Sequence, residues 1–78
     1  MHAKDLQLLR ASIGHNVILC CTDGEVIVAE IYSVSEEDED IIYDVVSTNR
    51  PDASRERAAY LMPFSEVSSV EPEQGEAR

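Results

Sequence analysis

The chain has 78 residues, with 16 acidic and 6 basic side chains, a formal net charge of −10 and 44% apolar residues. This length suits one small domain and excludes a two-domain enzyme. The negative charge opposes tight binding to nucleic acid or to anionic membranes, because both are polyanions.

The first predicted element is a short helix over residues 3–13. Leu6, Leu9 and Ile13 recur at a spacing that places them on one helical face. Gly14 follows the last of them, and glycine commonly ends a helix. The sequence therefore predicts an N-terminal helix that ends at this glycine.

Two runs rich in β-forming residues follow, over 16–22 and 25–34, joined by Asp23-Gly24. An Asp-Gly pair between two such runs is a strong signal for a β-hairpin. Both residue types can take the positive φ of a type I′ turn, so we expect that turn here.

Five consecutive acids at 36–40 separate the second run from a third β-run at 41–48. Like charges repel and stay hydrated, so this segment suits an exposed turn and completes a three-stranded meander. Carboxylates can bind a divalent cation, but the Gly and Glu positions of an EF-hand are missing, which favours a solvated turn.

The segment after residue 49 is ambiguous. Pro51 suits the first position of a helix, and local propensity favours such a helix over the following residues. The alternative is a fourth strand at 58–62 and a fifth at 66–70, and Pro63 ends either element. Residues 72–78 are polar and predict a disordered acidic tail, which leaves 1–71 as a single domain.

No secretory signal is evident near the N-terminus, and the longest apolar run, Val17–Cys21, is far shorter than the roughly 18 residues that span a bilayer. Cys20 and Cys21 are adjacent, so their Cα atoms lie about 3.8 Å apart, whereas a disulfide needs at least about 4.4 Å. We expect a cytoplasmic protein with two reduced, inert thiols.

Two stretches resemble the sequence motifs of the Sm-like family of small β-barrels. The first comprises Gly14-x-x-Val17-x-Leu19, Asp23-Gly24 and Ala29-x-Ile31, and the second is Tyr60 to Glu71. The resemblance implies a mainly β fold, in which a short N-terminal helix precedes five strongly bent antiparallel strands that close a small barrel. It therefore favours strands over a helix at 58–62.

The chain departs from the Sm-like pattern at three places. The glycine usual near the middle of strand two is Ala29 here. The acidic run stands where family members carry the Asp-x-apolar-Asn segment that binds RNA bases. Residues 63–66 replace the family's second RNA contact, a basic residue followed by Gly. Neither RNA-binding motif can be carried over to this chain.

The resemblance also implies assembly, because Sm-like barrels join into rings by pairing strand four of one subunit with strand five of the next. This fits the small size of the domain, since small scaffolds often need oligomerisation to complete their burial. We therefore expect a homo-oligomer through residues 58–70. The predicted interface residues are Tyr60, Met62, Phe64, Val67 and Val70.

Catalytic and metal-binding patterns are missing from the sequence. His2 lies at a frayed terminus, and His15 has no Cys, His, Asp or Glu at ligand spacing beside it. Neither a Gly-x-Ser-x-Gly elbow nor a glycine-rich phosphate loop occurs. A barrel of this size fills its interior with side chains. We predict no catalytic residue, no metal site and no cofactor, and hence a protein that is not an enzyme.

One loop gathers half of the basic residues. It holds Asn49, Arg50, Arg55 and Arg57, and the arginines are offset by Asp52 and Glu56. Such a loop can contact phosphate or an acidic segment of a neighbouring subunit, although an ordinary solvated loop is the simpler interpretation.

Two functions follow. The first is a non-catalytic, ring-forming interaction module that binds itself and also suits a protein partner. The alternative is a divergent RNA-binding Sm-like protein that uses the loop at 49–57. A weaker third interpretation is an acidic mimic of nucleic acid, which the run at 36–40 suggests.

Overall fold

The computed structural model of the protein describes residues 1–50 and 59–73. Its elements are α1 (Ala3–Ala11), β1 (Asn16–Cys21), β2 (Val26–Ser35), β3 (Asp40–Thr48), β4 (Tyr60–Pro63), the 3-10 turn η1 (Phe64–Glu66) and β5 (Val67–Pro72). The predicted mainly β fold with a short N-terminal helix is confirmed. Residues 60–63 form a strand, whereas the helix considered from Pro51 and the end of the predicted tail lie largely outside the described residues.

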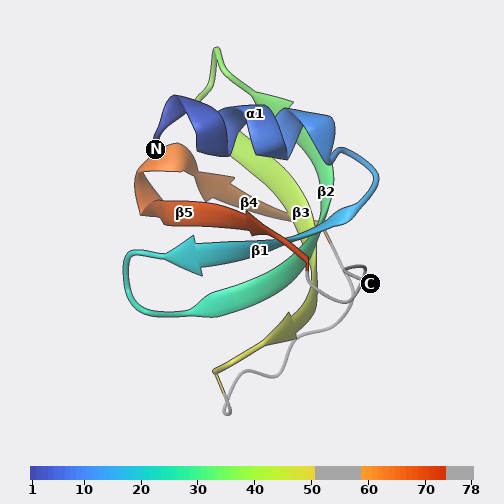
Figure 1. The fold of residues 1–78 in the computed structure, drawn as a ribbon, viewed down its shortest axis with the longest axis vertical. Helices are drawn as coiled ribbons and strands as arrows, with labels where there is room; N and C mark the ends of the chain where they lie inside the picture. Colours follow the sequence, from blue (N-terminus) through green and yellow to red (C-terminus); the bar gives the residue numbers. More distant parts are fainter. Residues whose placement is uncertain (51–58, 74–78) are drawn as a thin grey trace.

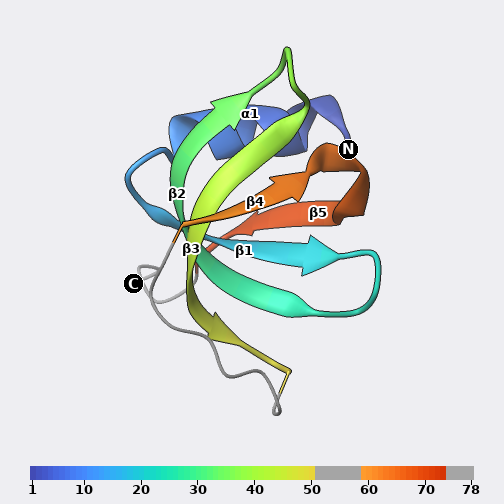
Figure 2. The ribbon, with the colours of Figure 1, turned by 180° about the vertical axis from the view of Figure 1, so that it is seen from behind.

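The five strands form one antiparallel sheet in the order β4-β3-β2-β1-β5, so β4 and β5 are its two edges. Figures 1 and 2 show a strongly curved sheet with α1 lying across one end, and β4 leads through η1 directly into β5. Among the described residues, however, no ladder joins these two strands. The predicted closed barrel is therefore wrong in this respect, and the sheet is open.

Curvature in β2 arises from irregular pairing with β3. The register shifts between Val28 and Ala29 and again between Ile31 and Ser33. Bulges of this kind bend a strand and increase its twist. The extra residue is Val46 of β3 at the first shift and Tyr32 of β2 at the second, so each strand carries one bulge. The bend in β2 thus needs no glycine of the kind that the Sm-like pattern places near Ala29, and Ala29 itself is fully buried.

The core lies inside the curved sheet and is closed at one end by α1. Its fully buried large side chains are Leu9, Leu19, Ile27, Ile31, Ile41 and Val17. The helix ends at Ala11, two residues earlier than predicted, and Ile13 is 46% exposed rather than on a buried face. The chain then turns at Gly14, whose φ of +87° suits glycine.

The hairpin between β1 and β2 forms at Asp23-Gly24 as predicted, but its turn differs from type I′. Gly24 has a φ of +95°, whereas Asp23 does not have positive φ. The N–H of Gly24 donates to Cys21 C=O at 3.0 Å, and the N–H of Cys21 donates to Glu25 C=O at 2.9 Å. These bonds define a three-residue loop with glycine in the left-handed position, the next most common way to close a hairpin.

The acidic run forms the turn between β2 and β3, and its residues 36–39 are exposed as predicted. Glu39 has a φ of +58°, the left-handed conformation that an L side chain adopts at a cost of about 1–2 kcal/mol. The tip also carries an exposed ion pair, in which Arg10 lies 2.6 Å from Glu36.

We expect the substitution Glu39→Gly to stabilise the protein. Glycine adopts positive φ without the steric cost, and the change also removes one of five adjacent negative charges. A net gain of about 1 kcal/mol would raise the melting temperature by roughly 4–8 °C. Glu37→Gly is the matched control, because it removes the same charge where φ is not positive. An equal rise in both variants would show that charge, and not conformation, is responsible.

Candidate functional site

Asn49, the first residue of the predicted contact loop, fastens the end of β3 to the β1–β2 hairpin. Its Oδ1 accepts a hydrogen bond from the Val26 N–H at 2.9 Å, and its own N–H donates to Val26 C=O at 3.1 Å. Its Nδ2 also donates to Gly24 C=O at 3.4 Å. The side chain predicted to contact a ligand therefore holds the fold together.

Arg50 is held by two carboxylates of the same hairpin. Its guanidinium lies 2.8 Å from Asp23 and 3.5 Å from Glu25. The Glu25 side chain is only 6% exposed and accepts a hydrogen bond from Thr48 Oγ1 at 2.6 Å. Arg55 and Arg57 lie outside the described residues, so the structure places only Asn49 and Arg50 of the predicted contact residues.

The hairpin turn also perturbs one carboxyl group. The backbone N–H of Glu25, which donates to Asp23 Oδ1 at 3.0 Å, and then the Arg50 guanidinium hold the pKa of Asp23 below its usual range. A lowered folded-state pKa stabilises the fold above the usual Asp pKa, and this contribution is lost as the pH falls through the folded value. The contribution of the Asp23 carboxyl group to stability is therefore present at neutral pH and is lost in acid.

The residues predicted at a subunit interface lie mostly in the protein's own core. Met62, Val67 and Val70 are buried, and Tyr60 and Phe64 pack against the same cluster. The groups of β4 and β5 that face outward are instead their outer backbone edges and the side chain of Leu61, which is 58% exposed. Sequence reasoning missed Leu61, although alternation with inward-facing residues on either side indicates it.

The outer edge of β4 presents backbone groups that point away from β3. Phe64 N–H donates to Glu39 C=O at 2.8 Å, and Met62 pairs with β3 in the same register. Because hydrogen bonding alternates along an antiparallel strand, the backbone of Leu61 and of Pro63 faces away from β3. Among residues 1–50 and 59–73, no ladder covers this side of β4.

The outer edge of β5 is different. The N–H of Val70 points away from β1 and donates to Asp5 Oδ1 at 3.2 Å, a bond between residues 65 positions apart. The next outward position is Pro72, which has no N–H to offer. Asp5 is buried, and its other oxygen accepts the N–H of His2 at 3.3 Å. Helix α1 thus covers the donor at the centre of this edge.

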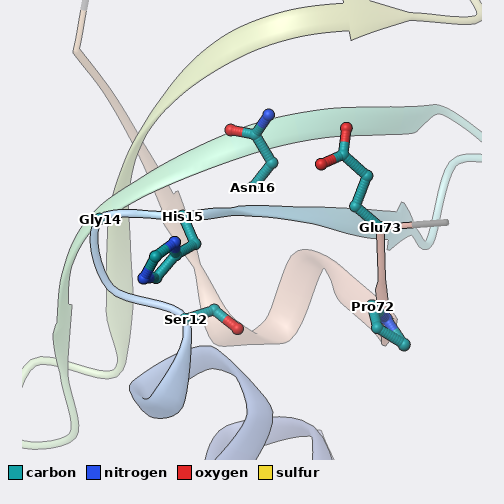
Figure 3. A pocket seen from close by; sticks show the side chains of 6 residues that line it. All are labelled: Ser12, Gly14, His15, Asn16, Pro72 and Glu73. Carbon is teal, nitrogen blue, oxygen red and sulfur yellow. The ribbon is translucent and has the colours of Figure 1, made fainter. Parts of the chain in front are cut away.

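The hollow where α1 leads into β1 is open and polar. Its lining residues are Ser12, Gly14, His15, Asn16, Pro72 and Glu73. In Figure 3, Asn16 and Glu73 lie on one side of β1, whereas His15 and Ser12 lie on the other. These side chains do not converge on one point. Within the described ranges, no three His, Cys, Asp or Glu residues are placed to hold a metal ion, including those of the acidic turn.

A second hollow lies beside Cys21 and contains Met62, with the two sulfur atoms 4.0 Å apart. Both cysteines are free thiols, as predicted. Partial burial, and then the neighbouring carboxylates of Asp23 and Glu25, raise the pKa of Cys21 to about 11. Few thiolates therefore exist at neutral pH, which suits an unreactive packing residue.

We expect Cys21 to react slowly with thiol reagents. In a Cys20→Ser variant at pH 8, a pKa of about 11 in place of 9.0 reduces the thiolate fraction roughly a hundredfold. The rate with an aromatic disulfide reagent should be lower than in denaturant by a similar factor and should rise with pH. An equal rate in native buffer and in denaturant would contradict the raised pKa.

Comparison of the chain with known protein families, with curated proteins and with solved structures gave no match. In the part of the chain that the structure describes, α1 is too short to cross a membrane.

Proposed function

We propose that the protein is a non-catalytic module that associates with copies of itself through the edges of its sheet. The observation that supports this most is the open sheet, whose two edges are not paired with each other among the described residues. Exposed strand edges are templates for pairing with another chain. In a 78-residue chain, such pairing also completes burial that one small core leaves unfinished.

The Sm-like assignment is part of this proposal. The helix followed by an antiparallel sheet in the order β4-β3-β2-β1-β5 agrees with the fold that the resemblance implies, apart from closure of the barrel. A ring of the Sm-like kind would pair β4 of each copy with β5 of the next. Such a ring therefore needs both edges to be available.

RNA binding has less support than self-association. Arg50 is engaged by two carboxylates, and Asn49 is used to fasten β3 to the hairpin. The exposed acidic turn would also repel a polyanion. We therefore do not advance the alternative of an RNA-binding protein with its contact at 49–57.

The proposal is tested by the mass of the protein in solution. Light scattering and sedimentation at micromolar concentrations should give a mass that is a multiple of 8.7 kDa. Added salt should strengthen association, because it screens the repulsion between chains of charge −10. A monomeric mass at every concentration and salt would overturn the proposal.

RNA binding is measured on the same samples. Labelled oligo(U) and oligo(A) should not bind at about 50 mM salt, where counterion release favours any phosphate contact. Binding that weakens steeply as salt rises would instead support the RNA alternative.

A further inference from the structure

The two edges of the sheet differ in the backbone groups that they offer, and this difference selects a partner. We propose that two copies of the chain join β4 to β4, antiparallel, about a two-fold axis at Leu61. This inference rests on the proposed self-association, and it replaces a ring built from β4 and β5 with a closed dimer.

The centre and the C-terminal end of the β5 edge offer no free donor to a neighbouring strand. Val70 N–H is already bound by the buried carboxylate of Asp5, and Pro72 has no N–H. A neighbouring strand at this position would have to displace α1 or leave its own carbonyl groups unpaired, and an unpaired buried carbonyl costs about 1–3 kcal/mol. Natural proteins protect edge strands in this way, with proline and with covering elements.

Among the described residues, nothing protects the centre of the β4 edge in this way. Leu61 presents its N–H and C=O outward, and its side chain is the most exposed large apolar group among the described residues. Pro63 still has an outward C=O, and Ala59, at the other end, is exposed. The edge therefore has donors at one end, an acceptor at the other and both kinds of group in the middle.

This arrangement is self-complementary in one antiparallel register. If Leu61 lies opposite the partner's Leu61, the two residues exchange both of their backbone hydrogen bonds. In the same register, Ala59 N–H faces the C=O of the partner's Pro63, and the reciprocal bond forms at the other end. The missing N–H of proline then costs only a terminal bond at each end. An interface that uses the same patch on both copies is the commonest kind in homo-oligomers.

Charge also favours contact between two β4 strands. The chain has a net charge of −10, yet the residues from Ala59 to Phe64 include no charged side chain. Two copies therefore meet with least repulsion along this segment. The two Leu61 side chains would lie side by side on one face of the joined sheet, and each would remove the other from water.

The experiment compares the wild type with two variants of Leu61 by sedimentation equilibrium. Leu61→Pro removes the outward N–H without removing a hydrogen bond to β3, and Leu61→Lys places a charge on the two-fold axis. Val46→Lys is the control, since Val46 is 41% exposed on β3, away from this edge. Circular dichroism verifies that each variant is folded, and Leu61→Lys serves if the proline variant does not fold.

The wild type and Val46→Lys should be dimers of twice 8.7 kDa, and both Leu61 variants should dissociate at least tenfold more readily. In hydrogen exchange, the Leu61 amide should gain protection as concentration rises, whereas the Val70 amide should be protected at every concentration. An oligomer larger than two, or a dimer that the folded Leu61 variants leave unchanged, overturns the β4 dimer and leaves self-association standing. A monomeric wild type overturns both.

Discussion

Replacement of Asp5 by alanine is expected to lower the free energy of unfolding by about 3 kcal/mol. The carboxylate is buried and accepts two backbone hydrogen bonds, one from His2 at the start of its own helix and one from Val70 on β5. Loss of the first removes the acid that stabilises the first helical turn. Loss of the second leaves a buried N–H unsatisfied, which is the more costly of the two effects.

Two other variants separate this effect from a general weakening of α1. Gln7→Ala changes an exposed position of the same helix and should leave stability almost unchanged. Asp5→Asn keeps an oxygen for the Val70 N–H but turns a donor toward His2, so its cost should be intermediate. Urea unfolding at pH 7 measures all three. A loss for Asp5→Ala no greater than that for Gln7→Ala would contradict the role of the carboxylate.

The same variant tests how the β5 edge is protected. Without the carboxylate, the Val70 amide should exchange its hydrogen much faster than in the wild type. The increase in its exchange rate should exceed the increase that the lower global stability alone would cause. Exchange that rises only in proportion to the lost stability would show that α1 covers this edge without the hydrogen bond.

Local patterns predicted most of the β-strands of this protein. The Asp23-Gly24 hairpin and the exposed acidic turn each depend on residues close together in sequence, and both form as expected. The details of the first turn escaped prediction, because Asp-Gly suits both a type I′ turn and a three-residue loop with glycine last. Hydrogen bonds of Cys21 to both Gly24 and Glu25 decide between them.

Contacts between distant residues could not be predicted in the same way. Neither the burial of Asp5 against β5 nor the ion pair of Arg50 with the first hairpin leaves a periodic signal. Closure of the sheet is also a global property, because it depends on the total curvature of five strands rather than on any one of them. The residues predicted at the interface are apolar, and in a small domain most apolar side chains pack in the core.

The second large effect is expected at Glu25, a buried carboxylate immediately before β2. It accepts a hydrogen bond of 2.6 Å from Thr48 Oγ1, and Arg50 lies 3.5 Å away. Thr48→Val keeps the shape of the side chain and removes the donor. Since a hydrogen bond to a charged group contributes about 1.5–3 kcal/mol, we expect a loss of about 2 kcal/mol in the free energy of unfolding.

Matched variants assign this loss to the hydrogen bond. Thr22→Val makes the same chemical change at an exposed position and should cost little, and Thr48→Ser keeps the hydroxyl. Arg50→Ala should cost less than Thr48→Val, because the guanidinium is partly exposed and solvent screens the pair. In a double-mutant cycle, Glu25→Gln should weaken the effect of Thr48→Val, since a neutral acceptor forms a weaker hydrogen bond. An equal loss in the free energy of unfolding for Thr48→Val and Thr22→Val would contradict this role of Thr48. The buried carboxylate of Glu25 would then be stabilised mainly by Arg50.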